Sequence, residues 1–453
     1  MTELVCPLDF RYGQEEMKAI LSEENRLQSQ LRVELALVRA HNKLGTVPDD
    51  DLVKLEEAFS QKKVKLERVK EIEAEIRHDV MAVVKAYTEV TGSAGKYIHL
   101  GATSYDIVDS ATAYQLKQVF ILLGTRLEGL RDTLFKRAEE HKGTVMLGRT
   151  HAQYATPITF GLKMAVFAME VNRHLQRLGE IEPRVCVGKM SGAVGSGAAF
   201  GPAFFDIQRL ALQDLGIGVE EAATQIVQRD RLTEFLCLLA NIAASLEKFS
   251  TEVRNLQRSE IMEAAEAFDV EKQVGSSTMA HKKNPIVSEN ISGLARIARA
   301  YLTPAFENVP TWHERDLSNS SAERFIIPHT VILVDDLLLK MEEVFRNLAV
   351  FPENMQRNMG GAKGLNMAES VLIKLAQKGM GRQESHELAR QLSMEALARG
   401  CHLRDVLKES DAVMSLLSED ELEEALDPAN YIGHSEQIVE KCMRKVYQGE
   451  DGF

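Results

Sequence analysis

The chain has few of the residues that mark secreted, metal-binding or membrane proteins. Its five cysteines are far apart and form no CxxC or Cys/His spacing, which favours reduced thiols over disulfides or zinc. No apolar run approaches the ~18 residues that span a bilayer, and the N-terminus lacks the basic and apolar regions of a signal peptide. Only 6% of the residues are aromatic. We therefore expect a soluble, cytoplasmic protein.

The chain carries fewer positive than negative charges, with 54 Lys and Arg against 67 Asp and Glu. The net charge of -13, with no long basic run, argues against non-specific binding to nucleic acid. An anionic substrate would need a local cluster of Arg and Lys, which screening over roughly 10 Å makes feasible. The chain has 453 residues, of which 45% are hydrophobic, and this is enough for a large core in two or three domains.

Strand-like alternation is almost absent, whereas helical spacing of apolar residues is common. The strongest pattern runs from Leu232 to Leu256 in steps of three or four residues. A helix over 231–265 would be roughly 50 Å long, which favours a bundle and burial against other subunits. Further helices are expected over 15–44, 49–70, 156–180, 286–307 and 322–348. Another is expected to begin near residue 72 and to include Arg77-His78-Asp79. A long helix is expected to begin at 103–106 and to end near residue 142. We predict an all-α fold with an N-terminal helical domain (1–105), a central long-helix bundle (106–350) and a C-terminal helical domain (351–453).

One stretch, Gly275 to Asn290, concentrates groups that could do chemistry. It contains hydroxyls, an imidazole at His281 and two ammonium groups, and Asn284-Pro285 is typical of a helix start. A loop that ends at a helix N-terminus can bind an anion. The alternative interpretation is a basic surface loop that happens to be capped.

Histidines occur in polar or Gly-rich settings at positions 78, 151 and 281, near the ends of predicted helices. The alternative for each is a structural histidine with satisfied hydrogen bonds. Thr103, Ser104 and Asp106 can each cap the helix that follows, and capping is their alternative role. The Gly-rich segment 188–202 lacks the Gly-Lys-Ser/Thr ending of a P-loop, so we interpret it as a tight connection or close backbone approach.

The sequence Ser-Ser-x-Met-x-x-Lys-x-Asn resembles the signature of the fumarase/aspartase superfamily, with Ala280 where proline is usual. Within that superfamily the chain resembles the adenylosuccinate lyase family. The argininosuccinate members usually have Gln at the position of His281, and the carboxymuconate members usually lack the histidine at 151. The motifs behind the resemblance are Arg77-His-Asp79, Thr103-Ser104 with Asp106, Gly148-Arg-Thr-His151, Gln225 with Gln-Arg-Asp230, the 275–290 stretch and Trp312 to Arg324.

The resemblance implies elimination of fumarate from adenylosuccinate, giving AMP, and from SAICAR, a succinylated carboxamide ribotide. Ser277 resembles the general base, His151 the general acid and Glu289 the carboxylate that orients the catalytic histidine. Lys282 and Asn284 are suited to stabilise the carbanion that forms when the Cβ proton leaves. Ser is a poor base at its ordinary pKa, so some group must activate it.

The same resemblance implies the substrate-binding residues. Thr103, Ser104 and Thr150 would bind the second carboxylate. The nucleotide end would be held by Arg11, Tyr12, His78, Arg315, Ser320 and Arg324, although Gly13 stands where the family usually has Ser. For Arg315 and Arg324, the alternative to binding the nucleotide end is a local ion pair with an acidic neighbour such as Glu314 or Glu323. The remaining expected contacts are Arg77, Asp79, Gln225, Ser276 and Met279.

The resemblance further implies a homotetramer whose sites draw loops from three subunits, small-molecule substrates only, and no metal or organic cofactor. Two other hypotheses stay open at this point. One is a sister lyase that acts on another succinyl or dicarboxylate substrate. The other is a helical scaffold that has kept the fold without the reaction.

Overall fold

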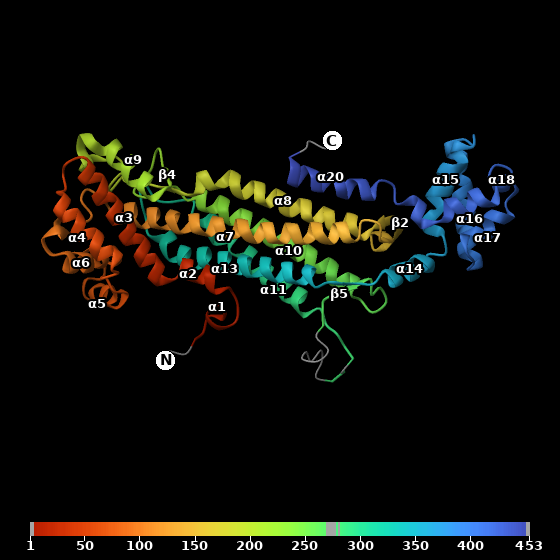
Figure 1. Ribbon diagram of the computed structural model, residues 1–453, viewed down its shortest axis with the longest axis horizontal. Coiled ribbons are helices and arrows are strands. Elements are labelled where there is room, and N and C mark those ends of the chain that lie inside the picture. Colours follow the sequence, from red (N-terminus) through yellow and green to blue (C-terminus); the bar gives the residue numbers. More distant parts are fainter. Residues whose placement is uncertain (1–3, 269–277, 280, 450–453) are drawn as a thin grey trace. The chain divides into compact units, whose positions relative to one another are not determined.

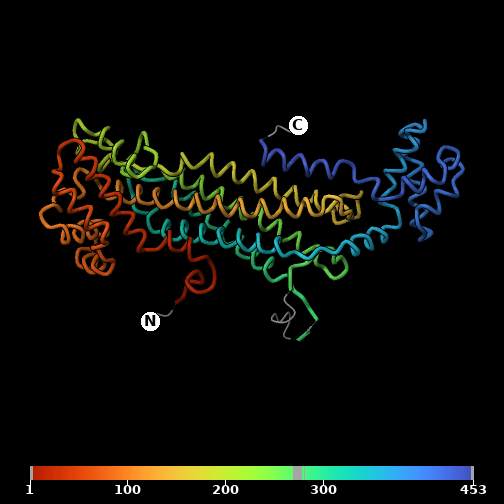
Figure 2. The backbone as a smooth tube through the Cα atoms, in the orientation of Figure 1, coloured from red at the N-terminus to blue at the C-terminus, as the bar shows by residue number. Residues whose placement is uncertain are grey.

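The structure, a computed structural model, describes residues 4–268, 278–279 and 281–449. Its packing divides the chain into two units. Unit 1 consists of Met1–Leu127, Arg173–Leu246 and Gly293–Leu339, and unit 2 of Glu128–Asn172, Glu247–Ser292 and Lys340–Phe453. Each unit is therefore assembled from three separated parts of the chain. Figure 2 colours the backbone by residue number, so that these parts can be located in it. The predicted division into three domains stays a prediction.

Five helices contribute residues to both units. They are α7 (Ser104–Glu140), α8 (Phe160–Val185), α10 (Asp230–Leu256), α11 (Ile286–Ala300) and α13 (Ser318–Arg346), labelled in Figure 1. In unit 1 the ring of Phe120 on α7 stacks on Phe235 of α10, with centroids 4.9 Å apart. In unit 2 Phe167, Phe249 and Phe345 bring α8, α10 and α13 together. Aromatic and aliphatic side chains thus form a helical core in each unit.

Unit 1 also holds the N-terminal helices, α1 (Pro7–Phe10), α2 (Glu15–Leu21), α3 (Glu23–Lys43), α4 (Asp49–Ser60), α5 (Leu66–Ile76) and α6 (Asp79–Thr91), and the 3₁₀ turn η1 (Gly92–Tyr97). Leu31, Leu35 and Tyr87 belong to one buried cluster among them. The Tyr87 hydroxyl donates to the Leu55 carbonyl at 2.8 Å, so its polar atom is satisfied inside that core. The unit is completed by η2 (Ala198–Ala203), α9 (Phe204–Leu215) and α12 (Leu302–Glu307).

Unit 2 contains the remaining short helices. These are α14 (Pro352–Gly361), η3 (Leu365–Met367), α15 (Ala368–Gln377), α16 (Arg382–Arg399), α17 (Leu403–Glu409), α18 (Asp411–Met414), α19 (Glu419–Leu426), η4 (Pro428–Tyr431) and α20 (Ser435–Gln448). Leu375, Leu403 and Leu422 belong to their common core. Ser418 and Glu421 form a reciprocal capping box at the start of α19. The prediction of short C-terminal helices is confirmed.

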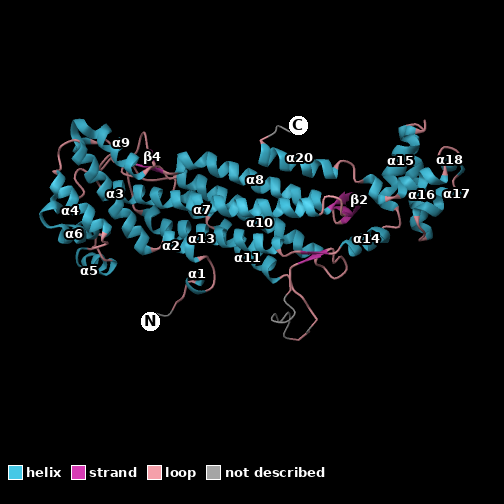
Figure 3. Cartoon of the chain, in the orientation of Figure 1, coloured by secondary structure: helices cyan, strands magenta, loops and turns pink. Residues whose placement is uncertain are grey.

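The all-α class is confirmed as well, because helices dominate the described residues and strands occur only as short pairs (Figure 3). The strands of these pairs are β1 (Val145–Thr150) and β2 (Gln153–Thr159), β3 (Val187–Gly188) and β4 (Gly218–Val219), and β5 (Ala264–Ala265) and β6 (Ala349–Val350). The β3–β4 pair is parallel and the other two are antiparallel.

The helix predicted from 156 to 180 begins later than expected. Thr156 and Pro157 lie in β2, and α8 starts at Phe160. The Thr159 hydroxyl accepts the Leu162 N–H at 3.1 Å, so Thr159 caps this helix. Sequence alone did not reveal the hairpin, because a Thr-Pro pair is also compatible with the strand at a sheet edge.

The helix predicted through Arg77-His78-Asp79 is wrong. α5 ends at Ile76, Arg77 adopts a left-handed conformation with φ of 55°, and α6 starts at Asp79. The predicted helix over 49–70 is likewise two helices, separated by residues 61–65. These breaks come from capping geometry, which apolar periodicity does not reveal.

The apolar stripe of 232–256 belongs to α10, which ends at Leu256 and is about 40 Å long. Leu239, Ile242 and Phe249 on this stripe are buried within the chain itself. The stripe therefore packs inside the protomer and does not by itself indicate a subunit interface. None of the described helices is long and apolar enough to cross a lipid bilayer.

Candidate active site

His151 lies at the tip of the hairpin formed by β1 and β2, in unit 2. Thr150 pairs with Gln153, so His151 and Ala152 are the two turn residues. Both have a left-handed backbone, with φ of 52° and 61°, as a type I′ turn requires. This conformation costs an ordinary residue roughly 1–2 kcal/mol. Strain of this kind clusters at functional sites, and here it presents an exposed imidazole on a rigid two-residue turn.

The hairpin contains a bulge between Leu147 and Arg149. At its centre, a Cβ atom on Gly148 would lie 2.5 Å from the carbonyl oxygen of Thr156. Only glycine permits that approach of the two strands. The glycine of the Gly148-Arg-Thr-His motif is therefore required by the backbone.

Arg149 anchors the hairpin to a buried carboxylate. Its two terminal nitrogens donate to Glu263 at 2.8 and 2.7 Å, and the Asn358 amide donates to the same carboxylate at 2.8 Å. Glu263 is 0% exposed, so its charge is satisfied entirely by these groups. The pair links the strand that leads to His151 with β5 and α14. Sequence reasoning missed Glu263, because nothing in its neighbourhood marks it as a partner of Arg149.

The start of α11 is held by residues from the segment before the signature stretch. Glu266 accepts the N–H groups of Val287 and Ser288 at 3.2 and 2.6 Å. Gln257 accepts the Glu266 N–H at 3.0 Å and donates to the Lys283 carbonyl at 3.0 Å. We had expected this helix N-terminus to be able to bind an anion. The anion it binds is the chain's own Glu266.

Of the candidates on this stretch, Ser276 (substrate binding) and Ser277 (general base) lie outside the described residues. Lys282 donates its backbone N–H to the Met279 carbonyl at 3.0 Å, which closes a turn, and its side chain is exposed. Asn284 lies directly before Pro285 and α11, and Glu289 is exposed on the first turn of that helix. Among the described residues, no hydrogen bond joins Glu289 to His151.

In unit 1, Asp106 takes the capping role at the start of α7. Its carboxylate accepts the Thr103 N–H at 2.8 Å, and its own N–H donates to the Thr103 carbonyl at 3.0 Å. Within the described residues, the hydroxyls of Thr103 and Ser104 make no hydrogen bond, although both residues are half-buried. The capping alternative thus holds for Asp106 and leaves the two hydroxyls available to a ligand.

Asp106 also organises the Gly-rich segment. It accepts the N–H groups of Ser191 and Gly192 at 2.9 and 3.0 Å and forms an ion pair with Lys189, both partners being fully buried. The predicted close backbone approach occurs at Gly195, where a Cβ atom would lie 1.9 Å from the Ala223 carbonyl oxygen. Gln225 donates to the carbonyl of Ala193 at 3.0 Å, so this substrate-binding candidate is held by the same Gly-rich segment.

His78 is the N-cap of α6. Its Nδ1 atom accepts the Met81 N–H at 3.3 Å. In the neutral ring the proton then resides on Nε2, so the exposed edge of this imidazole is a hydrogen-bond donor. Asp79 follows and places one carboxylate oxygen 3.4 Å from Arg324 of α13. Arg77 is exposed next to them.

The N-terminal candidates Arg11 and Tyr12 follow α1, with Arg11 exposed and Tyr12 half-buried. Gly13 stands where the resemblance would place Ser, and the fold explains this departure. Its φ is 89°, and a Cβ atom there would lie 2.3 Å from Cγ2 of Ile332. Any side chain at this position would collide with α13.

Arg315 is held by neutral partners. Its guanidinium lies 3.7 Å from the centroid of the Tyr105 ring, and Nη1 donates to Asn319 at 3.2 Å. Nη2 is buried and has no hydrogen-bond partner among the described residues. The Tyr105 hydroxyl donates to the Ser320 hydroxyl at 3.0 Å. These contacts contradict the alternative for Arg315, because the partners of its guanidinium among the described residues are Tyr105 and Asn319 and not Glu314 or Glu323.

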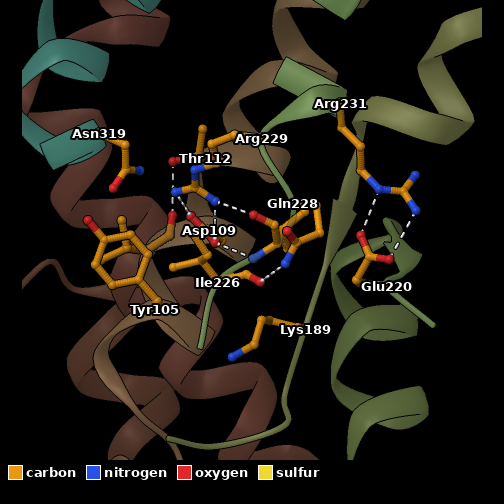
Figure 4. Close-up of polar contacts among 12 residues, drawn as sticks. Tyr105, Asp109, Thr112, Lys189, Glu220, Ile226, Gln228, Arg229, Arg231 and Asn319 are labelled. Carbon is orange, nitrogen blue, oxygen red and sulfur yellow. Dashed lines mark hydrogen bonds and ion pairs between the residues drawn. The ribbon is translucent and has the colours of Figure 1, made fainter. Parts of the chain in front are cut away.

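Figure 4 shows the buried pair of Asp109 and Arg229, with Tyr105 and Asn319 beside it. Arg229 donates to Asp109 at 2.8 and 2.9 Å and to Glu323 at 2.8 Å. Burial disfavours the charged guanidinium, but the two carboxylates outweigh it and raise the pKa of Arg229. Asn319 in turn donates to Glu323 at 2.7 Å. Sequence reasoning missed this network, because its members lie far apart along the chain.

Two cavities adjoin these residues in unit 1. One of about 330 Å³ is lined by Arg26, Tyr105, Ser320 and Arg324, among others. The second, of about 150 Å³, is lined by Arg26, Asp79 and Arg324, among others. The structure therefore brings together three motifs that the sequence separates, around Asp79, Thr103 and Arg315–Arg324.

The loop before Thr103 is anchored by a buried carboxylate. Glu34, which is 0% exposed, accepts the backbone N–H of His99 at 3.0 Å and contacts its Nδ1 at 2.7 Å. Burial lowers the basicity of the ring, but the hydrogen bond and charge of Glu34 prevail and raise the pKa of His99. His99 has φ of 64°, so this pair holds a strained turn.

The candidates thus fall into two groups. Unit 1 carries Arg11, Tyr12, Arg77–Asp79, Thr103, Ser104, Gln225 and Arg315–Arg324, and unit 2 carries Thr150, His151, Met279, Lys282, Asn284 and Glu289. Phosphate-binding residue types are concentrated in the first group. The proton-transfer and carbanion-stabilising candidates are concentrated in the second.

Comparison with known proteins identifies the family. Residues 10–299 match the lyase family model, and residues 364–442 match the model of the adenylosuccinate lyase C-terminus. Adenylosuccinate lyase of Pyrococcus horikoshii is 51% identical over 98% of this chain and 99% of its own length. Adenylosuccinate lyase of Methanocaldococcus jannaschii is 45% identical over 97% of this chain and 96% of its own.

Solved structures agree on the fold. A 3-carboxy-cis,cis-muconate lactonizing enzyme from Pseudomonas putida has a TM-score of 0.87 at 32% identity, with 97% of this chain and 99% of that chain covered. A fumarate lyase from a Mesorhizobium species has a TM-score of 0.88 at 31% identity, with 95% and 98% covered. The sequence relatives are the more similar, and they extend over both matched regions. The chain is a lyase and belongs to the adenylosuccinate lyase family.

Proposed function

We propose that this lyase eliminates fumarate from adenylosuccinate, leaving AMP, and from SAICAR, leaving the corresponding carboxamide ribotide, in purine biosynthesis. The names of its relatives support this substrate. The observation that carries the proposal is the buried Nη2 of Arg315, which has no hydrogen-bond partner among the described residues, in a guanidinium that Tyr105 connects to Ser320. A guanidinium held in this way is suited to a phosphate.

The reaction needs one proton removed and one supplied. Ser277, which lies outside the described residues, is proposed to take the proton from the succinyl Cβ. The electron pair then forms the double bond of fumarate as the C–N bond breaks, and His151 protonates the leaving nitrogen. The rigid turn at the hairpin tip supports this role, because a general acid must keep its position relative to the departing atom.

Charge that develops on the carboxylate next to Cβ must be stabilised as the proton leaves. We assign this to Lys282 and Asn284, which offer a cation and an amide donor. Thr103, Ser104 and Thr150 are proposed to bind the second carboxylate; among the described residues, the hydroxyls of Thr103 and Ser104 make no hydrogen bond. Backbone N–H groups of the loop from Ser276 to Met279 are proposed to join Lys282 and Asn284 at the first carboxylate. Gln225 and Ser276 complete the contacts to the succinyl group.

The nucleotide end is assigned to Arg11, Tyr12, Arg77, His78, Asp79 and the 315–324 group. His78 suits a neutral donor here because its Nε2 carries the proton. The Arg324–Asp79 contact at 3.4 Å supports the placement of both residues at this end.

We also propose a homotetramer in which each site combines residues from three subunits. Large apolar side chains on several helices support association: Ile121, Val166, Ile297 and Phe325 are each at least half exposed, at 65, 52, 50 and 61%. Glu289 would then orient the catalytic histidine of another subunit, consistent with the lack of a hydrogen bond to His151 among the described residues. The five free cysteines support a cytoplasmic location.

The test is fumarate release by the purified protein from adenylosuccinate, with argininosuccinate beside it. Fumarate and AMP from the first substrate alone are expected. Release from argininosuccinate alone would overturn the nucleotide-end assignment and favour a sister lyase. A folded oligomer that releases fumarate from neither would overturn the proposal and favour the scaffold hypothesis.

A further inference from the structure

Tyr105, the second residue of α7, contacts two of the phosphate-end candidates at once. The guanidinium carbon of Arg315 lies 3.7 Å from its ring centroid, and its hydroxyl donates to Ser320 at 3.0 Å. The tyrosine also lines the cavity of about 330 Å³ that Ser320 and Arg324 border. No other aromatic ring among the described residues lies so close to a cation.

The ring determines how the guanidinium is oriented. A planar cation that lies against an aromatic face is attracted to it and loses its freedom to rotate away. Nη1 of Arg315 is held by Asn319, whose own amide is held by Glu323. Nη2 remains as the buried donor without a described partner. The ring and Asn319 together hold the guanidinium in one orientation, and this pre-organisation lowers the ordering cost of binding an anion at Nη2.

The hydroxyl determines what Ser320 can do. A serine hydroxyl has one proton to donate and two lone pairs to accept. Because Tyr105 donates to the Ser320 oxygen, one lone pair is occupied and the serine proton is free to point elsewhere. Ser320 is thereby biased towards donating, which is the role that a phosphate oxygen requires.

We propose that Tyr105 is a positioning residue for phosphate recognition, which acts through Arg315 by its ring and through Ser320 by its hydroxyl. The inference rests on the proposed function and deepens it. It assigns a role to Tyr105 of the Thr-Ser-Tyr-Asp motif, in which Thr103 and Ser104 are proposed to bind a carboxylate of the succinyl group. One helix start thus serves both ends of the substrate.

The experiment compares adenylosuccinate with succinyladenosine, the same substrate without its phosphate, in the full-length oligomer. Tyr105→Leu removes both contacts, and we expect KM for adenylosuccinate to rise by about 15- to 300-fold, the combined loss of a partly desolvated cation–π contact and a neutral hydrogen bond, with kcat little changed. KM for succinyladenosine should change less than about twofold. Tyr105→Phe keeps the ring and should show only the part of the loss, about threefold to tenfold, that comes from Ser320.

Tyr114→Leu, on the same helix but in a core cluster away from these contacts, is the matched control. It should lower the melting temperature without changing the ratio of the two KM values. Equal losses for both substrates in Tyr105→Leu would reduce Tyr105 to a structural role and overturn the inference. If that variant does not fold, Tyr105→Phe decides the question. An unchanged ratio of KM for adenylosuccinate to KM for succinyladenosine would then contradict the proposal that the Tyr105 hydroxyl positions Ser320. A wild-type protein that cleaves neither substrate would instead overturn the proposed function.

Discussion

The fully buried carboxylate of Glu263 accepts hydrogen bonds from both terminal nitrogens of Arg149, at 2.7 and 2.8 Å, in unit 2. Arg149 precedes His151 by two residues, and the turn that carries His151 has little freedom of its own. The ion pair therefore fixes the position of the general-acid candidate through the strand, without any contact to the imidazole. Such supporting partners commonly decide how well a reactive group is placed.

Glu263→Gln should keep the shape of this contact while removing its charge. We expect kcat to fall by about 10- to 100-fold, because a displacement of the acid by an ångström is enough for such a loss. The unfolding free energy should fall by about 1–3 kcal/mol. Steady-state kinetics and chemical denaturation measure the two effects. Glu424→Gln, which breaks the more exposed pair with Lys374 in the same unit, is the control and should leave kcat unchanged. Equal effects of the two variants on kcat would contradict the special role of Glu263.

His151→Gln should lower turnover by orders of magnitude and leave the oligomer intact, because an amide at neutral pH cannot donate a proton to the leaving nitrogen. Rapid-mixing assays and size-exclusion chromatography measure the two properties. Near-normal turnover would remove His151 from the acid role.

Ala152→Gly tests the strain at the same turn. Glycine adopts the left-handed conformation of position 152 freely, so the substitution should stabilise the protein by up to about 1 kcal/mol, less any entropy gained by the unfolded chain. A calorimetric melting curve measures this. A large destabilisation would indicate that the Ala152 side chain makes a contact that outweighs the strain.

Arg324→Ala should mainly raise KM, since the residue is assigned to a group distant from the reacting atoms. An increase of about 10- to 100-fold is expected for loss of a charged hydrogen bond to phosphate. The control is the substrate without phosphate, for which the variant and the wild type should be alike. An effect confined to kcat would show that the residue is misplaced in our assignment.

The His99–Glu34 pair should make stability depend on pH. The pKa of His99 is raised in the folded protein, so its contribution is complete below the ordinary histidine pKa of about 6.5 and is lost as the pH rises through the higher folded value. Melting temperatures between pH 6 and 9 should therefore fall more steeply for the wild type than for His99→Gln. Parallel curves for the two proteins would contradict this.

Much of the site could be predicted from local sequence. The signature stretch, the histidine motifs and the segment 312–324 predicted the type of reaction, which the family comparison confirmed. Capping of α7 was correctly foreseen for Asp106. The turn at Arg77 and the hairpin at His151 were not foreseen, because both depend on left-handed residues that are neither glycine nor asparagine. Such conformations are imposed by surrounding packing and leave no mark in composition.

The sequence by itself determined the helical class, through the period of its apolar residues, and the reaction chemistry, through groups that lie within a few positions of one another. Only the tertiary structure decided which charges are paired. Glu263 lies 114 residues from Arg149, and Asp109 lies 120 residues from Arg229. The reason is physical: a buried charge takes whichever opposite charge the packed helices bring within hydrogen-bonding distance, and that choice is made by the fold as a whole.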